Sequence, residues 1–397
     1  MRRKIFAIGC VSILLIAMAA KVSETSVYQQ TMAEDTESMA PVMTAEEKYE
    51  TALNNGADLC FWYDDEAYEE FFKDAVVSYY DKEGIVVKLC YVDNIDYVGE
   101  IYDATMADAA FPDVYLLSGE ELEKAYLYGV AKENDASEAY EGIVAENAVN
   151  ASIYGNKMYG YPLSYNVCLL AYNSQYFTEQ PTSLRAIIDY SDENEPDENV
   201  EYLLEWDVHD PFYDFLFVSE SVVVDKTEAG VMEVSYNDAM LDASLTFLQE
   251  SLESFSIPID TVSERSVLND VISGKTLCAI IDSDSIKDIQ TSGCEVIEFP
   301  KLNDEIGARS VALTDMLVVN DFTTDKNEAS AFAKFLSLEQ SEKLWELSGH
   351  YPVKIQDNAS IYEKTAYQAY ENAILAPNSH DEGGFWVDLN EMITQYF

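Results

Sequence analysis

Residues 58–129 alternate between strand-like and helix-like segments, and this alternation limits the possible folds more than any other feature of the chain. Apolar runs of strand length occur at 59–63, 85–92 and 114–117, with helix-like segments between them. Repeated strand–helix units give parallel strands joined by right-handed crossovers, so the expected fold class is α/β. Ligands of such sheets bind beyond the carboxyl ends of the strands. The residues at those ends are Asp64, Asp65, Asp93 and Ser118 to Glu120.

Two of the expected helices carry local signals of their own. In the first, apolar side chains recur at three- and four-residue steps, which predicts a helix with one buried face. These side chains are Tyr68, Phe71, Phe72, Ala75 and Tyr79. In the third, Ser118 and Glu121 have the spacing of a capping box.

A second constraint lies at 154–173, near the middle of the chain. Gly155 and Asn156 are turn formers, which predicts a tight turn into a strand. Pro162 has no N–H to donate and is expected to end that strand, whereas the apolar run at 167–172 is expected to be a strand buried on both faces. Two interpretations are open. The stretch is a core strand entered from a surface hairpin, which residue chemistry alone favours, or it is a hinge between two lobes.

The same stretch resembles the crossing segment of extracellular solute-binding proteins of the maltose-binding type. In that family a Gly-Lys-x-Tyr-Gly-Tyr-Pro run precedes an apolar strand that ends in Tyr-Asn. The residues in those places here are Gly155, Lys157, Tyr159, Gly160, Tyr161, Pro162, Tyr172 and Asn173. Similar segments follow in the family's order over nearly the whole chain after residue 58. They are 62–65, 84–87, 111–115, 177–182, 207–215, 273–281, 299–300, 317–320 and 385–386.

This resemblance implies a two-lobed periplasmic-binding-protein-like fold of type II, with the ligand cleft between lobes that are joined by hinge strands. It places residues 53–163 and 317–345 in lobe 1, and residues 164–316 and 346–397 in lobe 2. The function it implies is the extracellular component of an ABC importer, which binds a solute by lobe closure and passes it to membrane permease subunits. A monomer without a cofactor is expected.

The resemblance also implies a set of ligand-binding residues, carried over position by position. They are Asp64, Ser118, Glu120, Asn166, Asp210, Phe212, Asp284 and Trp386. Leu117 and Asp284 stand where maltose-binding relatives carry tryptophans, and Asn390 stands where they carry an arginine. These departures put maltodextrin itself in doubt and leave a neutral mono- or oligosaccharide as the expected ligand.

The tryptophans divide by their surroundings in the sequence. Trp62 and Trp345 lie on core-facing patterns and are expected to be structural, while the pattern around Trp206 does not decide. Trp386 follows Gly383 and Gly384 at an expected helix start. The resemblance favours a place in the cleft for it, and a place in the core of the second lobe is the alternative.

The start of the chain has the features of an export signal. Residues 1–4 are basic, 5–20 are apolar, and Ala17 and Ala19 have the spacing that a signal peptidase reads, so 1–20 is expected to be a signal peptide. An uncleaved membrane anchor is the alternative. Cys10 lies too early for a lipoprotein acceptor. Residues 21–52 are expected to be a flexible tether, and the protein is expected outside the cytoplasmic membrane.

The charge balance excludes several partners. The chain has 23 basic and 74 acidic residues, a formal net charge of −51. Nucleic acid and anionic membrane surfaces are poor partners, since both need a basic surface. A cationic solute such as a polyamine is the alternative ligand class, held by carboxylates against aromatic faces.

Cysteine spacing gives no metal site. Five cysteines follow the predicted signal peptide: Cys60, Cys90, Cys168, Cys278 and Cys294. None forms a Cys-x-x-Cys or Cys/His pattern, so buried thiols are expected, with a Cys278–Cys294 bridge possible if their strands are neighbours. The acidic run at 189–201 lacks an EF-hand pattern and is expected to be a solvated loop. No metal is therefore expected.

Catalytic motifs are absent from the sequence. It contains no Gly-x-Ser-x-Gly, no phosphate-binding Walker loop, no dinucleotide fingerprint and no His-Glu-x-x-His. A glycosidase-like carboxylate pair is recognised only by its separation in space, so a secreted carbohydrate-active enzyme is a second alternative. The favoured interpretation is a binding protein and not an enzyme.

Overall fold

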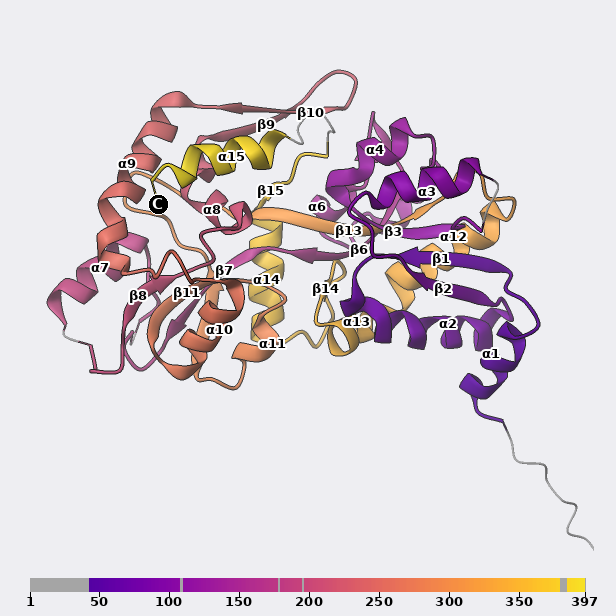
Figure 1. Ribbon diagram of the computed structural model, residues 1–397, viewed down its shortest axis with the longest axis horizontal. Coiled ribbons are helices and arrows are strands. Elements are labelled where there is room, and N and C mark those ends of the chain that lie inside the picture. Colours follow the sequence, from indigo (N-terminus) through magenta and orange to yellow (C-terminus); the bar gives the residue numbers. More distant parts are fainter. Residues whose placement is uncertain (1–42, 108–109, 178, 195, 379–383, 397) are drawn as a thin grey trace, which may run out of the picture. The chain divides into compact units, whose positions relative to one another are not determined.

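The computed structural model describes residues 43–107, 110–177, 179–194, 196–378 and 384–396 (Figure 1). The predicted signal peptide lies outside the described residues, as does the tether up to residue 42. The last part of that predicted tether is helical, since α1 spans Ala45–Leu53. Thr44 and Glu47 explain the helix start, because each side chain accepts a hydrogen bond from the other residue's backbone N–H, at 3.1 and 2.8 Å.

The larger sheet has the strand order β14-β6-β13-β3-β1-β2, with β15 paired to β13. Its strands are β1 (Leu59–Tyr63), β2 (Val87–Tyr91), β3 (Val114–Ser118), β6 (Gly160–Asn166), β13 (Val311–Val319), β14 (Tyr351–Pro352) and β15 (Ile374–Leu375). β1 is parallel to both β2 and β3, which confirms the parallel strands expected at 58–129. β13 is antiparallel to β3 and β6.

Helices α2 (Glu69–Glu83) and α3 (Tyr97–Met106) lie on opposite faces of the larger sheet (Figure 1). The period of two along β1 decides which side chain meets which helix. Phe61 packs against Phe72 of α2 with a ring separation of 4.7 Å. Trp62 points the other way and joins the cluster that contains Tyr97 of α3. The amphipathic pattern of residues 68–79 is confirmed, because its apolar side chains are buried.

The smaller sheet has the order β12-β7-β11-β8. Its strands are β7 (Cys168–Asn173), β8 (Tyr202–Glu205), β11 (Thr276–Asp282) and β12 (Cys294–Glu298). The run at 167–172 is buried throughout, which confirms the expected two-sided burial. The possible Cys278–Cys294 bridge is wrong, because both thiols are free. The physical reason is that β11 and β12 both pair with β7 and lie on either side of it.

The chain passes from one sheet to the other between β6 and β7, with only Val167 between the two strands. This favours a hinge at 154–173 over a strand within one core. The expected strand end at Pro162 is wrong, because Pro162 lies inside β6. Asp315 and Met316 of β13 pair with Ser164 and Pro162, so the register skips Leu163, and a bulge in β6 beside the proline accommodates a residue without an N–H.

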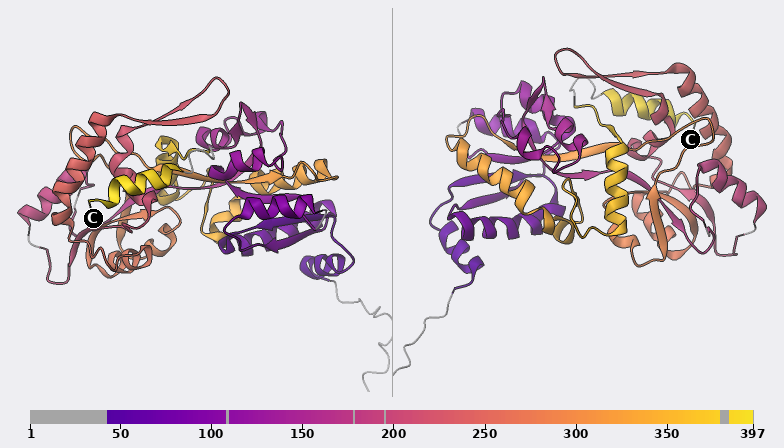
Figure 2. Two further views of the ribbon diagram at one scale, coloured as in Figure 1. Left: turned by 45° about the horizontal axis from the view of Figure 1, so that its top comes forward. Right: turned by 180° about the vertical axis from the view of Figure 1, so that it is seen from behind.

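Two short ribbons complete the β structure, and Figure 2 shows the hairpin at residues 222–236 at the top of both views. One is formed by β4 (Ile153–Tyr154) and β5 (Lys157–Met158), the other by β9 (Val222–Lys226) and β10 (Met232–Tyr236). The turn predicted at Gly155 and Asn156 is confirmed, with φ values of 56° and 63°. These left-handed values suit a Gly and an Asn in a tight hairpin.

The remaining helices connect these strands. They are η1 (Glu66–Tyr68), η2 (Gly119–Glu121), α4 (Leu122–Leu127), α5 (Ser137–Tyr140), α6 (Glu146–Ala151), α7 (Leu184–Glu193), α8 (Pro211–Val218), η3 (Ser219–Ser221), α9 (Asp238–Phe255), α10 (Glu264–Ser273), α11 (Ile286–Ile289), α12 (Lys326–Lys334), the π-helical η4 (Phe335–Glu339), α13 (Ser341–Ser348), α14 (Ile361–Asn372) and α15 (Gly384–Thr394). The capping box expected at Ser118 is wrong, because its side chain makes no capping hydrogen bond and a 3₁₀ turn precedes α4. Within the described part of the chain, no helix is long and apolar enough to cross a membrane.

Three tryptophans have structural surroundings. Trp62 is buried and Trp206 is fully buried, where its Nε1 donates to Asp214 at 2.7 Å. Trp345 is half-buried and stacks on Tyr351 at a ring separation of 4.1 Å. The core positions expected for Trp62 and Trp345 therefore agree with the structure. Trp206, for which the sequence pattern did not decide, is also a core residue.

Candidate functional site

A pocket of about 330 Å³ contains most of the residues that the sequence singled out. Its lining is made of acidic, amide and aromatic side chains with a few apolar residues. They are Glu120, Asn166, Asp210, Pro211, Phe212, Tyr213, Glu264, Asp282, Leu313 and Trp386. A larger pocket of about 650 Å³ lies elsewhere, between β9, α6 and β15, and contains none of the eight predicted residues. We take the smaller pocket as the candidate site, because it lies where strands of both sheets end.

Each functional side chain of the pocket stands at the end of a strand or the start of a helix. Glu120 follows β3 of the larger sheet, and Asn166 is the last residue of β6. Asp282 ends β11 of the smaller sheet. Asp210 caps α8 and accepts a hydrogen bond from the backbone N–H of Phe212 at 2.9 Å. These ends hold polar groups at the pocket while the strands behind them are buried.

Trp386 forms one wall of the pocket. It lies in the first turn of α15, is half-buried, and its indole Nε1 donates a hydrogen bond to the Glu120 carboxylate. Its neighbour Phe385 is buried instead and meets the Trp386 ring edge-on at 4.8 Å. Two successive aromatics therefore face different surroundings, one the core and one the pocket.

Five of the eight predicted ligand-binding residues line this pocket, and three do not. The five are Glu120, Asn166, Asp210, Phe212 and Trp386. Asp64 is exposed after β1, and Ser118 is half-buried at the end of β3, opposite Asp315. Asp284 forms an ion pair with His350. For these three, contact with a ligand stays a prediction without support from the pocket's lining.

Sequence reasoning missed part of the lining. Asp282 ends β11, and its position directly after the apolar run at 277–281 is the signal that could have found it. Glu264 begins α10, and no pattern in the sequence connects it with the other lining residues. Tyr213 follows the predicted Phe212. It lies in the segment 207–215 that resembles the family, but the resemblance did not assign it to the site.

The pocket has an excess of negative charge. Burial, together with the neighbouring carboxylates of Asp315, Glu121 and Asp210, raises the pKa of Glu120 to about 7, although the hydrogen bond from Trp386 acts in the opposite direction. Burial also raises the pKa of Asp210 and of Glu264. No lysine or arginine is among the lining residues. The site therefore offers hydrogen-bond acceptors, and Glu120 is near its point of protonation at neutral pH.

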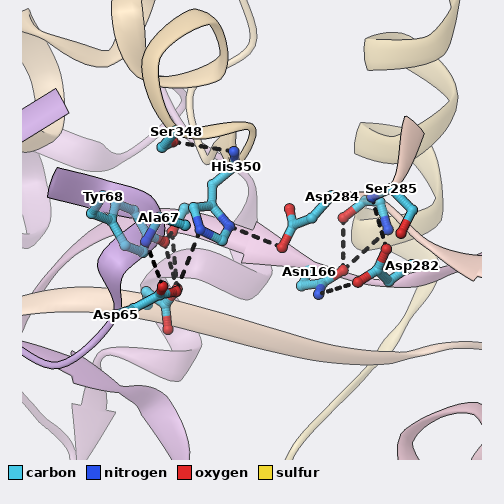
Figure 3. A network of polar contacts seen from close by, with 12 residues as sticks. Asp65, Ala67, Tyr68, Asn166, Asp282, Asp284, Ser285, Ser348 and His350 are labelled. Carbon is cyan, nitrogen blue, oxygen red and sulfur yellow. Dashed lines mark hydrogen bonds and ion pairs between the residues drawn. The ribbon is translucent and has the colours of Figure 1, made fainter. Parts of the chain in front are cut away.

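A second polar network lies beside the pocket (Figure 3). The His350 ring nitrogen Nδ1 lies 2.9 Å from Asp284 Oδ2, and Nε2 lies 3.5 Å from Asp65 Oδ2. The ring also stacks on Tyr68 at 4.2 Å. Burial alone would lower the pKa of His350, but hydrogen bonds to Asp284 and Asp65 raise it to about 10. A protonated histidine thus joins carboxylates that follow β1 of the larger sheet and β11 of the smaller one.

Asn166 makes a further connection between elements of the two sheets. Its Oδ1 accepts hydrogen bonds from the backbone N–H and the hydroxyl of Ser283, at 3.1 and 2.9 Å. Its Nδ2 donates to Asp282 at 3.4 Å (Figure 3). The end of β6 is therefore tied to the turn after β11, next to the pocket. In the described part of the chain, no group of three or more His, Cys, Asp or Glu residues is arranged to hold a metal ion.

We expect the protein to be more stable at pH 5.5 than at pH 8. Burial raises the pKa of Asp214 to about 8 and those of Glu205 and Glu120 to about 7. Since these values exceed the ordinary ones, the folded state binds more protons than the unfolded state between roughly pH 4 and 8. The free energy of unfolding should therefore rise as the pH falls, by up to about 1.4 kcal/mol per pH unit for each titrating group. Thermal melts across this range measure the effect.

A matched variant separates these groups from the rest of the acidic surface. Asp214→Asn keeps the shape and the partner of the carboxyl group but cannot titrate. It should show a shallower dependence of melting temperature on pH than the parent protein. A melting temperature that falls steadily from pH 8 to pH 5.5 in the parent would contradict the assignment.

The fold and the site together define a two-lobed α/β binding protein with its candidate pocket at the ends of strands from both sheets. The chain belongs to the family described as bacterial extracellular solute-binding protein, whose model matches residues 45–372. It is similar to the galactooligosaccharide-binding protein of Bacillus subtilis (strain 168), with 22% identity over 309 residues, which cover 73% of this chain and 71% of that protein.

Solved structures of sugar-binding proteins share the fold. A cyclo/maltodextrin-binding protein in complex with maltotetraose aligns with a TM-score of 0.72 and 19% identity, over 85% of this chain and 91% of that one. An extracellular solute-binding protein from Staphylococcus aureus in complex with maltose aligns with a TM-score of 0.71 and 19% identity, over 85% and 92%. The maltotriose-binding protein of Thermus thermophilus, bound with maltotriose, aligns with a TM-score of 0.67 and 15% identity, over 85% of this chain and 94% of that one. The expected type II two-lobed fold is confirmed.

Proposed function

We propose that this protein is the extracellular component of an ABC importer and that it binds a saccharide in the pocket around Trp386. The observation that carries the proposal is the combination of aromatic and acceptor groups on one pocket. Trp386 and Phe212 can cover the apolar faces of a sugar ring. Glu120, Asp210 and Asn166 can bond to its hydroxyl groups. The volume of about 330 Å³ is at the low end of ligand pockets, which suits a short saccharide.

The similar proteins support the same ligand class. The relative from Bacillus subtilis is named for galactooligosaccharide, and two of the similar structures hold maltose or maltotriose. We propose a neutral mono- or oligosaccharide and leave the individual sugar open. We further propose that the predicted division into 53–163 with 317–345 and 164–316 with 346–397 marks the lobes. A ligand that contacts both lobes would favour their closure about the β6–β7 hinge.

We propose that the protein is exported, acts as a monomer outside the cytoplasmic membrane, and passes its ligand to membrane permease subunits without altering it. The family supports export and binding.

A panel of saccharides should separate binders from non-binders by thermal shift. A neutral saccharide at 100 times its dissociation constant adds about 2.7 kcal/mol to the free energy of unfolding, which raises the melting temperature visibly. A sugar phosphate of the same size should have no effect, because four carboxylates and no cation line the pocket. Calorimetry then gives the affinity. Tight binding of the sugar phosphate would contradict the proposed site.

The charge of the pocket favours one second candidate. Glu120, Asp210, Glu264 and Asp282 could hold a polyamine against Trp386, as a cation over an aromatic face. Spermidine in the same thermal-shift panel decides between the two, since stabilisation by spermidine without any response to sugars would replace the saccharide proposal.

A bound saccharide recovered unchanged after long incubation excludes a hydrolase. Shorter sugars produced in proportion to the protein would instead indicate the enzyme.

A further inference from the structure

The larger sheet brings together two cysteines that the sequence leaves unconnected. Cys60 lies in β1 and Cys90 in β2, and their sulfur atoms are 3.7 Å apart. Both side chains are half-buried, so reagents in solution can reach them. The other three cysteines of the described chain are buried, and the sulfurs of Cys168 and Cys294 each lie near a backbone carbonyl.

Strand register explains why these two sulfurs meet. In the parallel ladder of β1 and β2, Cys60 is opposite Lys88, and Cys90 is opposite Trp62. Cys60 lies two residues before Trp62 on the same strand, and Cys90 lies opposite Trp62 on the neighbouring strand. Both thiols therefore point to the face of the sheet that carries Trp62. They form a diagonal pair, and the sulfurs must approach further to reach a bond of about 2.05 Å. β2 is the last strand in the order of the sheet, so it has a neighbour on one side only and can move to allow this.

The two thiols differ in their readiness to react. The hydrogen bond from Cys60 lowers the pKa of Cys90 to about 6, and the charge of Lys88 acts in the same direction, while burial opposes both. The same hydrogen bond and burial raise the pKa of Cys60. The shared hydrogen bond thus favours loss of one proton from the pair, and Lys88 favours Cys90 as the thiol that loses it. A thiolate is the attacking species in disulfide exchange.

We propose that Cys60 and Cys90 are a redox pair that closes to an intramolecular disulfide by exchange with a disulfide oxidant outside the cytoplasm. The Cys90 thiolate attacks one sulfur of the oxidant, which forms a mixed disulfide and releases one thiolate. Cys60 loses its proton to that thiolate and attacks Sγ of Cys90, which releases the second half of the oxidant as a thiolate. Two cysteines are oxidised and one oxidant molecule is reduced to a thiol and a thiolate.

The bond would join two strands of the larger sheet through residues 30 apart in the sequence. A cross-link of this kind restricts the unfolded chain and so stabilises the folded one. Neither cysteine lines the candidate pocket. Oxidation should therefore raise the melting temperature by several degrees without changing ligand affinity, and this inference does not depend on the proposed ligand.

The test is oxidation of the purified chain with oxidised glutathione at pH 7.5, followed by mass spectrometry of the intact protein and of its peptides. We expect the loss of two hydrogen atoms and a cross-linked peptide that contains Cys60 and Cys90. Cys60→Ser should stop at the mixed disulfide, with glutathione retained on Cys90, because the second thiol is gone. Cys90→Ser should react slowly, since Cys60 lacks the partner that supplies a thiolate.

Cys278→Ser is the matched control and should oxidise like the parent protein, because Cys278 is fully buried in the other sheet. If a variant fails to fold, mass spectrometry of the oxidised parent protein is sufficient to test the proposed disulfide. A parent that retains glutathione on Cys90, that keeps both thiols free, or that links another pair would overturn the proposal.

Discussion

Replacing Trp386 by alanine is expected to weaken ligand binding by a factor of about 30 or more, which corresponds to about 2 kcal/mol. The change removes an aromatic wall of the pocket and also the indole N–H that donates to Glu120. Because Trp386 is only half-buried, the melting temperature of the ligand-free protein should change little. Calorimetric titration with the saccharide found in the panel measures the loss.

Phe385→Ala is the matched control on the same turn of α15. Phe385 is 3% exposed and packs against Phe215 at a ring separation of 6.0 Å. Its removal should cost about 3–5 kcal/mol of stability and leave binding intact at low temperature. The replacement of Trp386 should thus reduce mainly the affinity for ligand, and that of Phe385 mainly the stability of the fold. A Trp386→Ala protein that unfolds early yet binds normally would assign Trp386 to the core instead.

Replacing His350 by alanine is expected to give a large loss of stability, about 3 kcal/mol. The His350 side chain is 12% exposed and pairs with Asp284 and Asp65. Removing one partner of a largely buried ion pair leaves an uncompensated charge, which costs about 3–5 kcal/mol. We expect the low end, because Asp65 is 47% exposed and water screens it. Urea denaturation at pH 7 gives the difference.

The pH dependence of this loss has a definite sign. A pKa of about 10 for His350 lies above its ordinary value of 6.5, so the folded state holds the proton more tightly. The contribution of the histidine is therefore fully present below pH 6.5 and is lost as the pH rises through about 10. Burial raises the pKa of Asp284 to about 7, so protonation of this partner weakens the ion pair on the acid side. The difference between parent and variant should narrow accordingly at high pH. His209 provides the control, since it is 58% exposed beside Asp207 and its replacement by alanine should change stability by less than about 0.5 kcal/mol. Equal losses for the two histidines would contradict the ion-pair argument.

Local sequence patterns determined the elements of this fold. The strand–helix alternation at 58–129 predicted parallel strands, because apolar period and turn chemistry act over a few residues. The turn at Gly155 and Asn156 and the buried run at 167–172 follow from the same short-range rules. Where a local rule failed, a distant partner was the cause. Pro162 stays inside β6 because the pairing of β6 with β13, which is far away in the sequence, is irregular beside the proline.

The candidate site could be predicted only in part. The resemblance identified Asn166, Asp210, Phe212 and Trp386, because each lies within a segment that keeps the family's order. It also identified Glu120, which follows the strand that begins in the segment 111–115. It gave no way to find Glu264, whose place at the pocket depends on how α10 packs against the smaller sheet. Asp284 was predicted for the site but does not line the pocket, because it pairs with His350, which comes from a different part of the chain.

The sequence by itself therefore determined the α/β class and the parallel strands, since these depend on residues that are close in the chain, and the family resemblance added the crossing segment. Only the tertiary structure decided which acidic groups share one pocket, that His350 is held between two carboxylates, and that Cys60 faces Cys90 while Cys278 and Cys294 are kept apart by β7. These outcomes depend on strand order and register. Both are set by the burial of whole faces, which no short stretch of sequence contains.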